Sequence, residues 1–111
     1  MTGSVRDVAF FVVHAIDKPG MQEARTACRP AHRARLRDPG ADLVVRIGGP
    51  LTDSGGSMIG TMLIVEAENR AIVEDFIAGD PYSLAGIYAT VRIDPFNWGL
   101  TNLPTEGAAR G

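Results

Sequence analysis

The stretch VAFFVVHAI, residues 8–16, decides the fold of this chain. A strand drawn over residues 5–16 has two apolar faces, with Val8, Phe10, Val12 and Ile16 on one and Ala9, Phe11, Val13 and Ala15 on the other. A strand that is apolar on both faces is typical of one that is buried on both sides. The turn signal Pro19-Gly20 ends it. We therefore expect a strand inside a sheet that is covered on each side.

The segments that follow read as one helix and then a hairpin. Residues 21–38 are rich in Ala, Arg, Glu, Gln and Leu, which favour helix, and Pro30 is expected to kink this helix or to restart it. Residues 43–47 alternate as a second strand, which we expect to end at Gly48-Gly49-Pro50. Residues 57–66 form the third strand, after a turn of Asp, Ser and Gly.

The second half predicts another helix and strand. The helix covers residues 70–78, with Asn69 as its N-cap and Gly79 as its C-cap, and the fourth strand covers residues 87–93. The order β-α-β-β-α-β predicts an α+β, ferredoxin-like fold with a four-stranded antiparallel sheet and both helices on one face. The other face stays bare, and a second copy of the chain is its simplest cover. We therefore expect a homodimer.

Length and composition limit the organisation of the chain. Its 111 residues, 11.8 kDa in mass, suit a single domain over residues 1–98 and a C-terminal tail over residues 99–111. The tail is rich in Pro, Gly, Asn and Ala, and we expect it to be partly disordered, most clearly over residues 104–111. No internal repeat is present in the sequence.

Charge and cysteine content argue against several classes of function. The net charge of −2 and the pI near 5.6 predict neither nucleic acid nor a membrane surface as a partner. No stretch approaches the roughly 20 apolar residues of a membrane helix. The single cysteine, Cys28, belongs to no zinc pattern, and a small buried core residue is its default reading. We expect a cytoplasmic protein without a metal or another cofactor.

Two histidines and one aspartate are candidates for chemistry. His32 lies on the first helix and His14 lies in the first strand. Histidine moves protons near neutral pH, but composition alone favours a solvated His32 and a packed His14. Asp80 precedes a proline, where carboxylates usually form turns. Its functional alternative is to accept a hydrogen bond from a histidine and to fix that ring's tautomer.

The remaining candidates carry weaker signals. The two glycine-rich segments, 48–50 and 55–57, match no phosphate-binding loop, and a hairpin is the better reading. Ser57 lacks the surroundings of a serine nucleophile. Arginines recur every four residues on the first helix, as Arg25, Arg29, Arg33 and Arg37. Such a stripe is usually a solvated face, but Arg29 and Arg33 are also placed to attract an anionic ligand beside His32.

Taken together, the motifs resemble those of the YciI family of small dimeric α+β barrel proteins. The resemblance covers roughly residues 8–98, and its specificity comes from the order and spacing of motifs that are each weak. The matching pieces are Asp17-Lys18, Arg29-Pro30-Ala31-His32-Arg33-Ala34-Arg35-Leu36, Gly49-Pro50, Gly56-Ser57, Asp80-Pro81-Tyr82, Ala85-Gly86-Ile87-Tyr88 and Phe96.

The resemblance implies a fold, an assembly and a site. Two ferredoxin-like subunits would pair their sheets face to face as a dimeric barrel. The His–Asp dyad proposed for the family falls on His32 and Asp80 as catalytic residues. Most family members have no established reaction, whereas one branch removes chloride from a chlorinated hydroxyhydroquinone without a cofactor.

Two main hypotheses of function follow. The first is cofactor-independent acid–base chemistry (elimination, isomerisation or lyase type) on a small cyclic or enolisable molecule. His32 would move the proton, Asp80 would orient its ring, and the substrate-binding residues would be Arg29, Ser57, Tyr82 and His14. The second is a non-catalytic module that binds a small molecule or regulates a partner. A pure oligomerisation scaffold is a weaker third reading.

Overall fold

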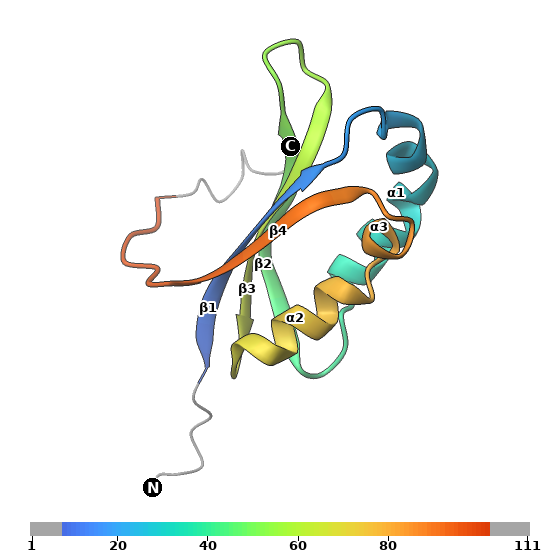
Figure 1. Cartoon of the computed structure of the whole chain (residues 1–111). Helices are drawn as coiled ribbons and strands as arrows, with labels where there is room; N and C mark the ends of the chain where they lie inside the picture. Colours follow the sequence, from blue (N-terminus) through green and yellow to red (C-terminus); the bar gives the residue numbers. More distant parts are fainter. Residues whose placement is uncertain (1–7, 103–111) are drawn as a thin grey trace, which may run out of the picture.

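The computed structural model describes residues 8–102, which form one four-stranded antiparallel sheet and three helices (Figure 1). The order of the strands across the sheet is β2-β3-β1-β4. In chain order the elements are β1 (Ala9–Asp17), α1 (Gln22–Arg37), β2 (Leu43–Thr52), β3 (Met58–Ala67), α2 (Arg70–Ala78), α3 (Pro81–Leu84) and β4 (Tyr88–Phe96). The predicted α+β, ferredoxin-like βαββαβ subunit is confirmed, with β1 and β3 at its centre.

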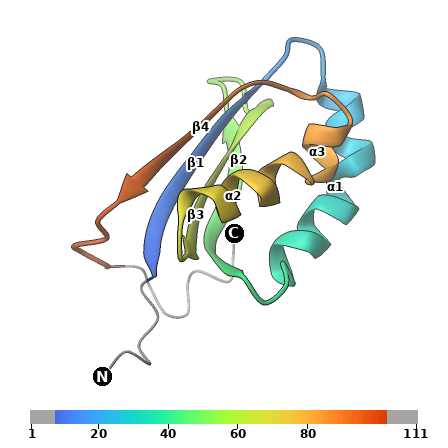
Figure 2. The ribbon, with the colours of Figure 1, turned by 60° about the horizontal axis from the view of Figure 1, so that its bottom comes forward.

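All three helices lie on one face of the sheet (Figures 1 and 2). The helix-facing residues of β1, namely Phe11, Val13 and Ala15, are at most 5% exposed. The opposite face of β1 is half-buried or exposed in the single chain, so the expected burial on both sides is not reached without a partner. The core between the two layers is formed by Phe11, Val13, Leu43, Leu63, Val65, Ala67, Val73, Phe76, Ile77 and Ile93.

Two strands run further than the sequence predicted. The strand β2 continues through Gly48-Gly49-Pro50, where we expected it to end, and β4 continues past Ile93 through Pro95. Both are edge strands, so a proline that lacks an N–H can be accommodated without breaking an interior ladder. The first strand begins at Ala9, and the predicted start at residues 5–7 lies outside the described residues, as does the disorder predicted for residues 104–111.

The capping residues predicted for the second helix are confirmed, whereas two predictions for the first helix are not. Asn69 Oδ1 accepts a hydrogen bond from the backbone N–H of Ile72 at 3.0 Å, and Gly79 is the C-cap of α2, as predicted. A kink or a restart is predicted at Pro30, and α1 runs through Pro30 as one element, so the restart does not occur. Cys28 is only half-buried, which corrects its expected place in the core.

The short helix α3 is not predicted from the sequence, because a carboxylate before a proline, as at Asp80, usually forms a turn. Asp80 is its N-cap and Pro81 occupies its first turn, where a proline costs no hydrogen bond. No helix within residues 8–102 combines the length and the apolar character needed to cross a membrane.

Candidate active site

His32 and Asp80 meet between α1 and α3, although 48 residues separate them in the chain. Nδ1 of His32 lies 3.0 Å from Asp80 Oδ1 and 2.9 Å from Oδ2. Both residues are buried, with 6% and 2% of their surface exposed. The structure thus brings together the two residues that the resemblance proposed as a dyad.

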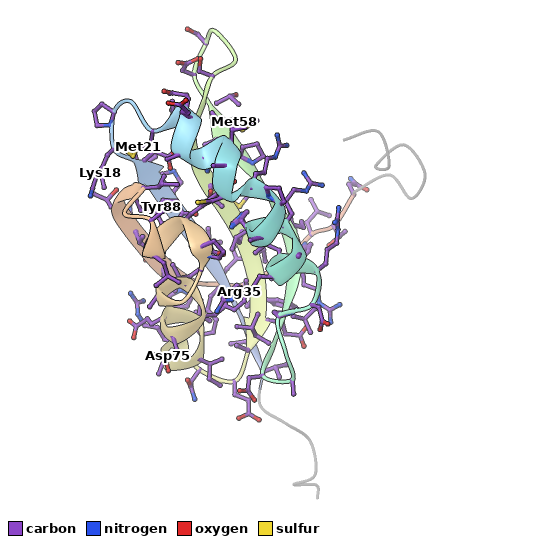
Figure 3. All side chains as sticks on the ribbon, turned by 90° about the vertical axis from the view of Figure 1, so that its right-hand side faces the viewer. Lys18, Met21, Arg35, Met58, Asp75 and Tyr88 are labelled. Carbon is purple, nitrogen blue, oxygen red and sulfur yellow. The ribbon has the colours of Figure 1, made fainter. Side chains whose placement is uncertain are left out.

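The position of Asp80 follows from its role as a helix cap. Its Oδ2 also accepts the backbone N–H of Tyr82 at 2.9 Å, which is a typical N-cap contact. Arg35 of α1 lies on the other side, with Nη1 3.7 Å from Oδ1 and hydrogen-bonded to the carbonyl of Phe76. Figure 3 looks onto the helices and shows Arg35 between α1 and α2. The carboxylate therefore has a fixed orientation toward the ring of His32.

This contact fixes the tautomer of His32. A carboxylate only accepts hydrogen bonds, so Nδ1 of the neutral ring must carry the proton that it donates to Asp80. Nε2 is then the basic nitrogen, and no described residue forms a hydrogen bond with it. A buried carboxylate also stabilises the imidazolium that forms when Nε2 takes a proton. The arrangement can therefore accept and return a proton at Nε2.

Tyr82 packs its ring against His32. The two ring centroids are 3.9 Å apart and the planes differ by 15°, which is a stacked arrangement. The guanidinium carbon of Arg25 lies 4.5 Å from the centroid of the same tyrosine ring. Burial raises the pKa of Tyr82, partly offset by the charges of Arg25 and Arg29. Tyr82 therefore stays a neutral phenol at physiological pH and contacts two side chains of α1.

A second buried polar cluster surrounds Arg25, and no sequence motif beyond the arginine stripe predicts it. Arg25 donates from Nε to Asp17 at 2.8 Å and from Nη2 to the carbonyl of Gly60 at 2.6 Å and to the hydroxyl of Thr61. Tyr88 donates its hydroxyl to Thr61 at 3.0 Å, and burial strongly raises the pKa of this phenol. The cluster connects α1 to β1, β3 and β4.

A cleft of about 750 Å³ opens beside His32, between α1 and β2. Its lining includes His32 and Tyr82 at the dyad, with Arg29 and Arg33 beside them and Gly48 and Gly49 on the opposite side. The volume is within the range of roughly 300–1,000 Å³ of small-molecule pockets. The dyad therefore lies at the wall of a cavity that a small organic molecule can enter.

The other expected ligand contacts divide into two groups. Arg29 and Tyr82 line the cleft together with His32. Ser57 is exposed in the turn between β2 and β3, where its backbone N–H donates to Asp53, and it does not line the cleft. His14 is exposed on the face of β1 away from the helices, where it pairs in register with Met62 of β3. The structure therefore does not bring Ser57 and His14 to the dyad.

Within residues 8–102, no group of three or more His, Cys, Asp or Glu side chains is arranged to hold a metal ion. Nδ1 of His32 and Oδ2 of Asp80 are already paired with each other.

Comparisons with known proteins identify relatives of similar length. The family described as YCII-related domain matches residues 9–97. An uncharacterized protein of Haemophilus influenzae is 36% identical over 93 residues, which cover 78% of this chain and 95% of that protein. Protein YciI of Escherichia coli is 35% identical over 95 residues, which cover 78% and 94%.

One similar solved structure has a described activity. It is 5-chloro-2-hydroxyhydroquinone dehydrochlorinase (TftG) from Burkholderia phenoliruptrix, in complex with 2,5-dihydroxybenzoquinone. The TM-score is 0.72 and the identity 30%, and the match covers 79% of this chain and 93% of that one. The family match over residues 9–97 spans the sheet, the helices and both residues of the dyad.

Proposed function

Because the chain belongs to the YCII-related domain family, we propose that it is a cofactor-independent enzyme of His/Asp acid–base chemistry. Its substrate would be a small cyclic or enolisable organic molecule. The observation that carries this proposal is the pairing of Nδ1 of His32 with Asp80, which leaves Nε2 as the unpaired basic atom of a residue that lines the cleft. The dehydrochlorinase activity of a similar structure supports an enzymatic role.

The proposed chemistry starts with proton abstraction. Nε2 of His32 takes a proton from the substrate, and the electron pair of that bond moves into the conjugated system. In an elimination, a leaving group such as chloride departs with its bonding pair, whereas in an isomerisation the imidazolium returns the proton to another carbon. A positioned base of this kind contributes about 10²- to 10⁴-fold to the rate. Orientation of the substrate in the cleft supplies the rest.

The substrate contacts in this proposal come from two residues. Tyr82 supplies a neutral phenol ring beside the base, and Arg29 supplies a cation at the edge of the cleft. Ser57 and His14 are left out of the proposed contacts, because neither lines the cleft.

The proposal includes a homodimer that covers the open face of the sheet. Phe10 and Trp98 pack edge to face at 5.4 Å, and Phe96 is 36% exposed on the neighbouring strand. Val44 adds exposed apolar surface on β2. A patch of this kind on a two-layer subunit favours a sheet-to-sheet partner.

A second candidate function has its own support. Asp80 caps α3 and also pairs with His32, so the dyad holds α3 to α1 whether or not it reacts. In that case the chain would be a module that binds a small molecule without converting it.

Chloride release from 5-chloro-2-hydroxyhydroquinone distinguishes the two functions. The enzyme hypothesis predicts release by the wild type and a loss of about 10²-fold or more in Asp80→Asn, since the amide no longer fixes the tautomer of His32. The matched control is Asp75→Asn, because Asp75 is an exposed residue of α2 and should leave turnover unchanged. Binding of 2,5-dihydroxybenzoquinone without release of chloride, by the wild type, would favour the binding module.

A further inference from the structure

The residues that line the cleft carry charge of one sign. Four arginines of α1 and Arg46 of β2 lie along it, and no Asp or Glu is found among its described lining residues. Clefts with one sign of charge and low-dielectric walls focus the field and concentrate ions of the opposite sign. We propose that the substrate is a small organic anion. Its carboxylate or enolate oxygens would bind Arg29 and Arg33 while its reacting carbon lies at His32.

Only two of the arginines that line the cleft are paired with a carboxylate of the described residues. Arg25 is committed to Asp17, and Arg46 to Glu66 at 2.9 and 2.6 Å. The other three arginines of the stripe, Arg29, Arg33 and Arg37, form no hydrogen bond or ion pair with any residue of the described range 8–102. Three guanidinium groups therefore remain available to a ligand along one side of the cleft.

The spacing of these arginines places an anion beside the base. Arg29 precedes His32 by nearly one turn and Arg33 follows it directly, so their Cα atoms bracket it over about 6 Å of helix. Residues four apart on a helix are neighbours on its surface. A guanidinium fork binds the two oxygens of a carboxylate in parallel. An acid held by both arginines would therefore present its adjoining carbon atoms to Nε2.

The opposite wall leaves room for a flat molecule. Gly48 and Gly49 line it, and Gly48 pairs in register with the core residue Leu63 of β3, on the face of the sheet toward the helices. A Cβ on Gly48 would press on the Leu63 side chain at 2.8 Å, so glycine keeps this wall free of a side chain. This inference rests on the proposed function for the reacting carbon at His32, whereas the anion site itself can be tested alone.

A matched pair of ligands tests the charge requirement by titration calorimetry. The first, 2,5-dihydroxybenzoquinone, is a vinylogous carboxylic acid and therefore an anion at neutral pH, whereas 2,5-dimethoxybenzoquinone has the same ring without an ionisable group. Benzoate serves as a second acid and inorganic phosphate as a competitor. The proteins are the wild type, Arg29→Gln, Arg33→Gln and Lys18→Gln. Lys18 is an exposed cation that does not line the cleft, so its variant matches the change in charge.

We expect the acids to bind and the dimethoxy compound to fail. Each arginine variant should weaken the Kd of the acid by about tenfold, as loss of a charge-assisted hydrogen bond does, and Lys18→Gln should match the wild type. The inference would be overturned if the dimethoxy compound bound as tightly as the acids, or if Lys18→Gln weakened the acid as much as the arginine variants do. It would also be overturned if phosphate bound to the cleft more tightly than the organic acids, or if neither acid bound. Arginine-dependent binding without chloride release would uphold the anion site and count against the proposed reaction.

Discussion

Arg25 and His32 lie two turns apart on α1 and are equally buried, with 4% and 6% of their surface exposed, but they differ in what they leave free. Arg25 uses its guanidinium on Asp17, Gly60 and Thr61. His32 uses one nitrogen on Asp80 and keeps the other unpaired. Arg25, a buried residue whose guanidinium is paired with strand residues, holds the helix to the sheet. His32, a buried residue with one basic nitrogen open to a cleft, has what acid–base chemistry needs.

The largest expected effect comes from removing the open nitrogen. We expect His32→Ala to lower turnover by about 10²- to 10⁴-fold. Its free energy of unfolding should fall by only about 1–3 kcal/mol, because Asp80 loses one partner but keeps the N–H of Tyr82. Chloride release and urea unfolding measure the two quantities. Added imidazole should restore part of the activity, which a purely structural histidine would not allow.

The reverse pattern is expected at Arg25. Arg25→Met leaves the buried carboxylate of Asp17 without its cation, and Oδ1 of that carboxylate already has no hydrogen-bond partner. Removing one partner of a buried ion pair costs about 3–5 kcal/mol. Urea unfolding should show this loss, and the double variant Arg25→Met/Asp17→Leu should be more stable than Arg25→Met. A double variant less stable than the single one would contradict the assignment of the cost to a stranded charge.

A smaller effect, with a pH signature, is expected at the edge of the Arg25 cluster. Tyr88→Phe removes one hydrogen bond to Thr61 and should cost about 0.5–1.5 kcal/mol at neutral pH. Because burial raises the pKa of Tyr88, its stabilisation is fully present below pH 10 and is lost as the pH rises toward the folded pKa. The difference in unfolding free energy between wild type and variant should therefore shrink above pH 10. If the difference in unfolding free energy stayed constant between pH 8 and pH 11, the raised pKa of Tyr88 would be contradicted.

Sequence reasoning predicted the fold better than the site, since most fold signals are local. Asn69 and Gly79 bound α2 where capping residues predict a helix boundary. The sequence does not predict that β2 and β4 continue through their prolines, because only the strand order shows that both are edge strands. The helix α3 could have been found, since an aspartate before a proline is also a capping signal.

The dyad could not be read from spacing. His32 and Asp80 are 48 residues apart, and composition alone favoured a solvated histidine, so only the resemblance pointed to the pair. The arginine stripe showed the opposite problem. Four arginines at equal spacing do not indicate that Arg25 turns inward, since that depends on Asp17 of β1 and on Thr61 and the carbonyl of Gly60 in β3.

The smallest expected effect lies at Arg35, which brings a cation near the dyad as Arg25 does near Asp17. Its Nη1 is 3.7 Å from Asp80, beyond a direct hydrogen bond, and its side chain is 30% exposed. Solvent screening reduces such a pair to about 0.2–1 kcal/mol, so Arg35→Gln should lower turnover by at most about fivefold.

The salt dependence of turnover separates the charge of Arg35 from its hydrogen bond to Phe76. A charge effect should shrink as sodium chloride is raised, because salt screens a partly exposed pair, whereas loss of the bond to the Phe76 carbonyl should not. Arg35→Lys keeps the charge and should keep most of the turnover. A loss in Arg35→Gln as large as in His32→Ala would mean that Asp80 depends on two partners alike, and the contrast between the closed cluster at Arg25 and the open one at His32 would no longer hold.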